Sequence, residues 1–348
     1  FSGVWEDKLI GQILTVGSGK DYKHLSNGDI PVYGTGGYML SVNDYLYDGE
    51  SVGIGRKGTI DKPIFLTGKF WTVDTLFYTH SFKNSVPKFI YSIFQRINWK
   101  LYNEASGVPS LSKSTIEKIK IFIPSKHEQE KIASFLISID TRIEQLTKKE
   151  ELLQQYKKGV MQKIFNQEIR FKADDGSEFC DWEEKKLGDI LDYIQPTKYL
   201  VKDTEYNDSY TIPVLTAGKT FILGYTNETD GVFENNLPVI IFDDFTTANK
   251  FVNFPFKAKS SAMKILVSKN NNIKFIYEAI QMIKYEVGGH ERHWISKFSF
   301  LNIFIPCIEE QTKIANFLSS IDSKIEKVKK QLNSTKEFKK ALLQQMFV

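Results

Sequence analysis

Apolar residues recur every three or four positions in two stretches of the chain, residues 126–168 and 308–348. A narrow apolar stripe of this kind, sustained over about three heptads, is typical of a coiled-coil helix. The pattern predicts two helices, each about 60 Å long at about 1.5 Å per residue. The stripe positions are Ile132, Leu136, Ile139, Ile143 and Leu146 in the first helix and Ile314, Leu318, Ile321, Ile325 and Val328 in the second.

A long helix with one narrow stripe needs a surface that covers the stripe. Each helix could pack on its own domain, or the two helices could pack on each other. We favour the second arrangement, an antiparallel coiled coil. Because domains and helices alternate along the chain, such a pair would carry one domain at each end.

The stretches before the helices contain short apolar runs between polar turns, which is typical of strands. The clearest runs are residues 239–242, 264–267 and 300–303. Residues 89–97 and 275–283 instead have the spacing of short amphipathic helices. The sequence therefore predicts an α+β fold with two mixed, strand-rich domains.

The chain is duplicated internally. Residues 128–144 recur as residues 310–326 at a constant offset (310 − 128 = 182), and residues 121–124 recur as residues 303–306. The helices are nearly copied, whereas the stretches before them share only scattered framework residues. A shared frame with different inserts suits a protein that makes the same kind of contact with two different targets.

This pseudo-two-fold repeat divides the chain into four expected parts. They are a first domain (1–125), a central helix (126–168), a second domain (169–307) and a C-terminal helix (308–348). Residues 166–181 form the expected linker into the second domain. Since residue 1 is Phe1 and not methionine, we expect the native N-terminus to precede it.

Composition narrows the class of protein. The 348 residues are 41% hydrophobic and 25% charged, as in ordinary soluble proteins. No signal peptide is visible, and no apolar run approaches the roughly 18–20 residues that span a bilayer. The only cysteines, Cys180 and Cys307, suit a reducing cytoplasm and offer no disulfide framework. A net charge of +4 is compatible with nucleic-acid binding.

Three motifs resemble catalytic or ligand sites and fail on inspection. Residues 53–58 match Gly-x-Gly-x-x-Gly, but strand and turn residues follow instead of a helix. Residues 17–20 lack the remaining P-loop positions. The histidines of residues 290–293 are three apart and have no third ligand, which makes a weak metal site. We therefore expect neither a catalytic residue nor a metal site.

In its order of domain, copied helix, domain and copied helix, the whole chain resembles the specificity subunit of type I DNA restriction-modification systems. The residues that carry the resemblance are Ile121-Phe122-Ile123-Pro124, Glu128-Gln129, Ile132 to Leu136 and Ile139-Asp140, their second copies between Ile303 and Asp322, and Trp182-Glu183 with Leu187-Gly188. The ordered, duplicated set is more specific than any of its pieces.

The resemblance implies a non-catalytic subunit. Each target recognition domain would recognise one half of a bipartite site in double-stranded DNA. The paired helices would fix the spacing and dock two methyltransferase subunits, and restriction subunits would complete the enzyme. This chain would hold no cofactor, because S-adenosylmethionine, ATP and magnesium belong on the partner subunits. The alternative is a non-catalytic scaffold whose two domains bind other proteins.

DNA recognition needs side chains that reach base edges and basic or hydroxyl groups that bind phosphates. In the first domain, two glycine-rich loops at residues 33–37 and 55–59 have this character. The predicted contacts are Tyr33, Gly34, Thr35, Arg56, Lys57 and Thr59. The alternative is a pair of β-turns with solvated charges.

Three loops of the second domain have the same polar character. Their predicted DNA contacts are Thr216, Lys219 and Thr220, then Thr246, Thr247, Asn249 and Lys250, and finally His290, Arg292 and His293. Asp243 and Asp244 precede the second group. Their carboxylates suit cytosine amino groups or, alternatively, a turn.

Overall fold

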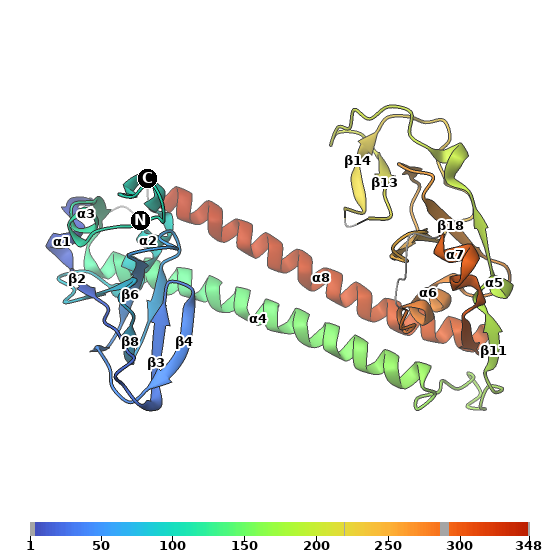
Figure 1. The fold of residues 1–348 in the computed structure, drawn as a ribbon, viewed down its shortest axis with the longest axis horizontal. Coiled ribbons are helices and arrows are strands. Elements are labelled where there is room, and N and C mark those ends of the chain that lie inside the picture. The colour runs from blue at the N-terminus through green and yellow to red at the C-terminus, as the bar shows by residue number, and fades with distance from the viewer. Residues whose placement is uncertain (1–3, 219, 286–291, 347–348) are drawn as a thin grey trace. The chain divides into compact units, whose positions relative to one another are not determined.

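The computed structural model describes residues 4–218, 220–285 and 292–346. The chain forms two compact units, one of residues 1–149 with 328–348 and one of residues 150–327. Both predicted long helices are confirmed (Figure 1). Helix α4 (Lys126–Phe165) has 40 residues and α8 (Ile308–Met346) has 39. Each helix contributes residues to both units.

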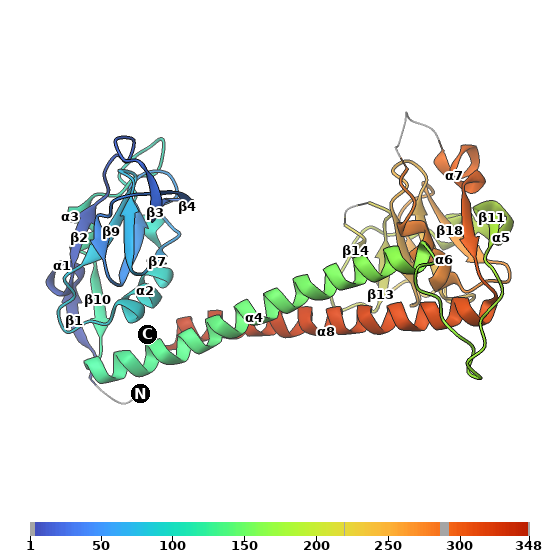
Figure 2. The ribbon, with the colours of Figure 1, turned by 90° about the horizontal axis from the view of Figure 1, so that it is seen from below.

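The first unit consists of short strands and helices, the first part of α4 and the last part of α8. Two four-stranded sheets, β2-β9-β6-β7 and β4-β3-β8-β5, lie beside the pair β1-β10, and Figure 2 shows β2 next to β9. The elements are β1 (Glu6–Leu9), α1 (Ile10–Ile13), β2 (Thr15–Ser18), β3 (Asn27–Gly34), β4 (Gly37–Val42), β5 (Tyr47–Asp48), β6 (Ser51–Gly55), β7 (Ile64–Leu66), β8 (Lys69–Thr72), β9 (Leu76–His80), α2 (Pro87–Arg96), α3 (Lys113–Glu117) and β10 (Lys120–Ile123).

The second unit resembles the first in its order of elements, but among the described residues it has one strand fewer, because one of its sheets has three strands where the first unit has four. Its sheets are β12-β18-β15-β16 and β14-β13-β17, beside the pair β11-β19. The elements are β11 (Glu183–Lys186), α5 (Leu187–Ile190), β12 (Leu191–Ile194), β13 (Ile212–Leu215), β14 (Ile222–Thr226), β15 (Val239–Asp243), β16 (Asn249–Val252), β17 (Lys257–Ala258), β18 (Met263–Ser268), α6 (Ile273–Gln281), α7 (His293–Ser296) and β19 (Asn302–Ile305).

Most local predictions agree with these elements. Strands β15 and β18 and helices α2 and α6 occupy the predicted segments, with ends shifted by a few residues. The strand predicted at residues 300–303 was placed too early. The Phe300 N–H donates to the Lys297 carbonyl at 3.1 Å and the Leu301 N–H to the Phe298 carbonyl at 3.2 Å. Because the N–H groups of Phe300 and Leu301 are used in this turn, they do not pair with a neighbouring strand. The strand therefore begins only at Asn302.

The duplicated Ile-Phe-Ile-Pro motif forms the same antiparallel strand pair in both units. Glu6 lies opposite Ile123 in the first pair, and Glu183 lies opposite Ile305 in the second. Successive side chains of a strand point to opposite faces. Ile123 is therefore buried, whereas its neighbour Phe122 is 55% exposed. The alternation explains why the motif has apolar residues at fixed positions in both copies.

The duplicated Glu-Gln motif has an equally local role. The Gln129 Oε1 accepts from the Val86 N–H at 2.9 Å, and its Nε2 donates to the Pro124 carbonyl at 2.9 Å. In the second unit, Gln311 binds the Asn272 N–H at 2.9 Å and the Pro306 carbonyl at 2.8 Å. Both glutamine side chains are buried. Each satisfies backbone groups that would otherwise be buried without partners, and each ties a long helix to the start of α2 or α6.

The two long helices pair in antiparallel orientation. In the first unit, Asp140 of α4 accepts from Lys339 of α8 at 2.6 Å. In the second unit, Lys157 of α4 donates to Asp322 of α8, also at 2.6 Å. The two ion pairs are copies of each other under the repeat, since 322 − 140 = 339 − 157 = 182. Rising numbers on α4 meet falling numbers on α8, as an antiparallel pair requires.

The apolar stripes serve the helix pair and the domains together. Ile132, Leu136 and Ile139 lie in the core of the first unit, where Leu342 and Leu343 from α8 also pack. In the second unit the predicted residues Ile314, Leu318 and Ile321 share a core with Met161 and Ile164 from α4. Leu146 and Val328 are buried, and Ile143 and Ile325 are partly buried against these cores.

Candidate DNA interface

The two candidate loops of the first domain lie next to each other. Residues 33–37 connect β3 to β4, and residues 55–59 follow β6. The Thr35 Oγ1 is 3.8 Å from the point that a Cβ on Gly58 would occupy. Gly58 has a φ of +95°, a conformation that favours glycine. The fold thus brings together two segments that the sequence singled out separately.

Arg56 combines exposure with a fixed position. Its guanidinium carbon lies 5.8 Å from the centre of the Phe77 ring, a cation–π contact that favours this placement. Its Nη1 also donates to the Asp74 carbonyl at 3.5 Å. A cation held at the surface in this way is suited to a DNA phosphate or to the acceptor edge of guanine.

A cavity of about 600 Å³ extends from Arg56 and Lys57 and includes Lys113 and Glu104. Hydrogen bonds lower the pKa of the Glu104 carboxyl, with the bond from Thr115 the largest cause. The ionised carboxylate is a pure acceptor, which matches the amino group of cytosine. Lys113 and Glu104 could not be predicted from the sequence, because no local pattern relates them to Arg56.

The other predicted contacts of the first domain differ in exposure. Tyr33, Thr35 and Thr59 are half-buried, and Lys57 is exposed. Gly34 is buried, and a Cβ there would lie 2.8 Å from the Met39 Sδ. The predicted DNA contact Gly34 is therefore not accessible in this structure, because it is the last residue of β3 and Met39 lies against it.

The candidate loop at residues 216–220 is the hairpin turn between β13 and β14. The Thr216 Oγ1 donates to the Thr220 carbonyl at 2.6 Å and accepts from the Gly218 N–H at 3.3 Å. Thr216 therefore closes the turn, whereas Thr220 is exposed. The third predicted contact of this loop, Lys219, lies outside the described residues.

The candidate loop at residues 243–250 connects β15 to β16. Asp243 closes this turn, because its Oδ1 accepts from the backbone N–H of Phe245 at 2.9 Å. Of the predicted contacts, Thr246 and Lys250 are exposed and Thr247 and Asn249 are half-buried. Of the two roles that the sequence left open for Asp243, the structure thus agrees with the role in the turn.

The third candidate loop requires a correction. His293 is fully buried, its backbone N–H donates to the Asp244 carbonyl at 2.8 Å, and its Nδ1 lies 3.1 Å from the Tyr285 hydroxyl. The prediction that His293 contacts DNA is therefore wrong in this conformation, since α7 turns its side chain inward. Arg292 is exposed, and His290 lies outside the part of the chain that the structure describes.

These contacts bring two of the three loops together. Asp244 is itself buried, and its Oδ1 accepts from the Trp294 N–H at 3.0 Å. His293 and Trp294, which follow Arg292, are thus held against the turn that begins at Asp243. The hairpin at residues 216–220 belongs to the other sheet of the unit.

Two buried lysines of the second unit were missed by the sequence analysis. Lys257 pairs with Glu228 at 2.8 Å, and Lys264 pairs with Asp244 at 3.6 Å. Each lysine side chain is only 1% exposed. Buried charges persist in proteins when they are paired. The one sequence feature that could have indicated this burial is the position of Lys264 within an apolar run.

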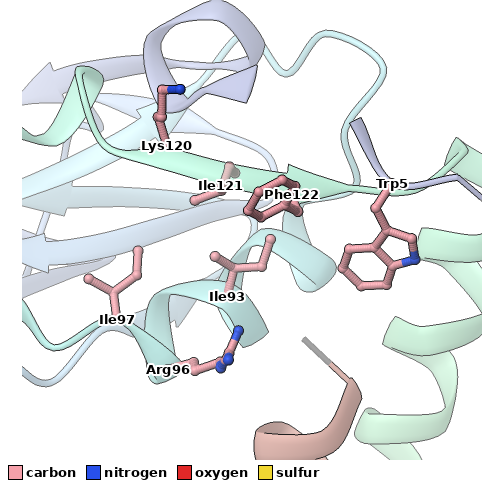
Figure 3. Close-up of a pocket in the computed structure, with 7 residues that line it drawn as sticks. All are labelled: Trp5, Ile93, Arg96, Ile97, Lys120, Ile121 and Phe122. Atoms are coloured by element: carbon pink, nitrogen blue, oxygen red, sulfur yellow. The ribbon is translucent and has the colours of Figure 1, made fainter. Parts of the chain in front are cut away.

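A separate cavity of about 420 Å³ lies beside β10 and α2 in the first unit (Figure 3). Apolar side chains make up most of its lining, and Arg96 and Lys120 supply the charges. The full lining is Trp5, Ile93, Arg96, Ile97, Lys120, Ile121 and Phe122. It includes none of the predicted DNA contacts, so this cavity and the candidate interface are different surfaces.

Within residues 4–218, 220–285 and 292–346, no cluster of three or more His, Cys, Asp or Glu residues is arranged to hold a metal ion. None of the helices in those ranges is long and apolar enough to cross a membrane. Residues 53–58 lie on β6 and the turn after it, and residues 17–20 lie at the end of β2.

One frame that appears twice, carries different loops and is joined by antiparallel helices defines an internally duplicated two-domain protein. The model of the family "Type I restriction modification DNA specificity domain" matches residues 3–154 and 180–336. The chain belongs to this family.

Individual relatives agree with this assignment. The chain is 55% identical over 141 residues to the EcoR124I/EcoR124II type I restriction enzyme specificity subunit of Escherichia coli, covering 39% of this chain and 35% of that protein. It is 27% identical over 347 residues to the MjaVIII specificity subunit of Methanocaldococcus jannaschii, covering 88% and 78%. The chain thus matches about a third of the first relative's length and most of the second's.

The fold also agrees with a solved structure. The type I restriction-modification S subunit of M. genitalium matches with a TM-score of 0.75, over 100% of this chain and 97% of that one. At 16% sequence identity, this likeness concerns the fold.

Proposed function

We propose that the chain is the sequence-specific DNA-binding subunit of a type I restriction-modification enzyme, in which each strand-rich domain recognises one half of a bipartite site. The observation that carries this proposal is the shared frame with divergent loops. The strand pair β1-β10 recurs as β11-β19, and the hydrogen bonds of Gln129 recur as those of Gln311. The loops above each frame differ, as two different half-sites require.

The same duplication supports the proposed partners. Two nearly identical helix surfaces suit two copies of one methyltransferase subunit, and restriction subunits would complete the assembly. The chain itself would be non-catalytic and without a cofactor. S-adenosylmethionine would bind to the methyltransferase subunits, and ATP and magnesium would serve the partner subunits. The assembly would act in the cytoplasm, where free thiols such as Cys180 and Cys307 stay reduced.

The direct test uses the purified chain. We expect it to bind duplex DNA with an affinity that falls steeply with salt, and to leave DNA unmethylated and uncut with S-adenosylmethionine, ATP and magnesium. Adding the methyltransferase subunit should produce adenine methylation at one bipartite sequence. Turnover that follows the isolated chain through purification would refute the non-catalytic role. If the chain does not bind DNA even at low salt, the alternative function, a scaffold that binds other proteins, would be favoured.

Arg56 and Lys57 provide a test of the interface in the first domain. Arg56→Ala and Lys57→Ala should each weaken DNA binding, and the slope of log K against log salt should fall by about 0.9 per lost phosphate contact. Lys118, which is exposed and lies outside the candidate loops, provides the control Lys118→Ala. Arg292→Ala should affect only the second half-site. Unchanged affinity and slope in all of these variants would show that the chosen loops do not touch DNA.

A further inference from the structure

A single buried carboxylate of the second unit holds together three segments that lie far apart in the sequence. Asp244 directly follows β15 and is 2% exposed. Its backbone carbonyl accepts from the His293 N–H at 2.8 Å, and its Oδ1 accepts from the Trp294 N–H at 3.0 Å. Its Oδ2 pairs with the Lys264 Nζ of β18 at 3.6 Å. The turn after β15 and the start of α7 are therefore fixed to each other and to the sheet.

The lysine in this pair makes the arrangement costly to change. The Lys264 side chain is 1% exposed, and its Nζ lies 4.8 Å from the centre of the Tyr193 ring. A buried ammonium group needs an opposite charge, and removing one partner of such a pair leaves an unpaired buried charge. Because the Asp244 carboxylate cannot leave this place without that cost, the ion pair holds the turn in one position.

The first unit has Arg56 at the position of Asp244. Arg56 directly follows β6, which has the same place in its sheet (β2-β9-β6-β7) as β15 has in β12-β18-β15-β16. Its carbonyl accepts from the Leu111 N–H at 2.9 Å, as that of Asp244 accepts from the His293 N–H. Leu111 and His293 each lie nine residues before the strand that carries the Ile-Phe-Ile-Pro motif (120 − 111 = 302 − 293 = 9). One backbone contact of the frame is thus present in both copies.

The side-chain partners at this position correspond as well. Phe77 of β9 lies opposite the next-to-last residue of β6, and Lys264 of β18 lies opposite the next-to-last residue of β15. The Arg56 guanidinium lies over the Phe77 ring and is exposed, whereas Asp244 pairs with Lys264 and is buried. The frame therefore presents a cation to the outside in the first unit and uses the equivalent residue as an internal anchor in the second.

The segments that Asp244 anchors carry groups that suit DNA. Thr246 and Lys250 of the turn are exposed, and so is Arg292. The Arg292 carbonyl accepts from the Ser296 N–H at 3.2 Å and from the Ser296 Oγ at 2.9 Å, so its backbone is fixed at the start of α7. Recognition of base edges requires that several such groups keep fixed positions relative to one another.

We propose that Asp244 is a positioning residue for recognition of the second half-site, an inference that rests on the proposed function. Asp244 itself does not touch DNA. Its hydrogen bond from the Trp294 N–H and its pair with Lys264 hold the turn after β15 and the start of α7 as one surface. The selectivity of that surface for bases depends on this connection. In the first unit, Arg56 contacts DNA directly from the equivalent position.

Two double variants separate the anchor from the stability that the pair provides. Asp244→Asn with Lys264→Gln is neutral and keeps an acceptor for the Trp294 N–H. Asp244→Leu with Lys264→Met replaces the pair with apolar side chains of similar size, an exchange that often preserves stability, but it removes the acceptor. We expect the apolar pair to lower the selectivity for the second half-site by about tenfold, the contribution of one good base contact. The neutral pair should retain that selectivity.

Selection of bound sequences from a random DNA pool measures the base preferences at both half-sites. Competition with DNA altered at one half-site then gives the selectivity as a ratio of affinities. The first half-site should keep its preferences in every variant. A merely structural role of Asp244 would lower the unfolding temperature and the active fraction, but it would leave the ratio for the second half-site unchanged.

An exposed ion pair of the same sheet provides the matched control. Asp192 of β12 pairs with Lys269, which directly follows β18, at 3.3 Å. Asp192→Leu with Lys269→Met makes the same chemical change at the other end of β18 and should leave both half-sites unchanged. Should leucine at position 244 lower the unfolding temperature by more than a few degrees, Asp244→Ala with Lys264→Met removes the acceptor without adding volume.

Two results would overturn this inference alone. One is unchanged selectivity for the second half-site in a folded variant with the apolar pair. The other is an equal loss of selectivity in the neutral pair, because that pair keeps the acceptor for the Trp294 N–H. A wild-type chain without base preference at either half-site would refute the proposed function, and this inference with it.

Discussion

Replacing both Ile139 and Ile321 with aspartate is expected to unfold the protein or abolish its assembly. Ile139 is 7% exposed in the core of the first unit, and Ile321 is 2% exposed in the core of the second. An unpaired charge in such a core costs several kcal/mol, and the lost apolar contacts add about 2–5 kcal/mol at each site. Typical domains are stable by only about 5–15 kcal/mol.

Because the two isoleucines lie in different units, each single substitution should destabilise mainly its own unit. Chemical denaturation followed by circular dichroism would measure both effects, and co-purification with the methyltransferase subunit would report assembly. Ile137→Asp is the control, since Ile137 is 36% exposed on the same helix. Full stability and normal assembly of the double variant would show that the stripes are not essential to either core.

Lengthening both helices by one heptad is expected to lengthen the DNA spacer between the two half-sites. Seven residues inserted after Leu146 and after Val328 preserve the apolar register. Both insertion points lie between the two ion pairs, Asp140 with Lys339 and Lys157 with Asp322, so each pair keeps its surroundings. Each helix gains about 10 Å at about 1.5 Å per residue. The preferred spacer should grow by roughly three base pairs at about 3.4 Å each.

The added base pairs also rotate one half-site around the duplex, so we expect weaker binding together with the shift. The half-site sequences should stay the same, since no recognition loop changes. Selecting bound sequences from a random DNA pool would measure spacer and half-sites together. An insertion in α4 alone is the control, and it should destabilise the antiparallel pair because the two ion pairs could no longer both form. Retained binding with an unchanged spacer would mean that the helix pair does not set the distance.

The long helices and the duplication could be predicted from the sequence because both depend on regular patterns. A stripe such as Ile132, Leu136 and Ile139 specifies a helix and its buried face within a few turns of chain. The repeat shows that Gln129 and Gln311 occupy equivalent positions, but it does not indicate what their side chains bind. Their hydrogen bonds to Val86 and Asn272 depend on segments about 40 residues away, which no local pattern indicates.

The recognition loops were harder to predict for the same reason. Loop position follows from turn residues, and the turns at Thr216 and Asp243 form where the polar clusters indicated. Loop exposure does not follow from them. His293 and Asp244 look polar and free in sequence, yet long-range packing buries both and pairs Asp244 with Lys264. Glu104 and Lys113 join the cavity beside Arg56 through tertiary folding alone.

The sequence by itself determined that this protein has two copies of one frame, two long helices with apolar stripes and two different sets of loops. These features depend on periodicity and on comparison within the chain. Only the tertiary structure decided that the stripes serve the helix pair and the domain cores together, and that equivalent positions of the frame hold the exposed Arg56 and the buried Asp244. Burial and pairing depend on residues far apart in sequence, and chain folding alone brings such residues together.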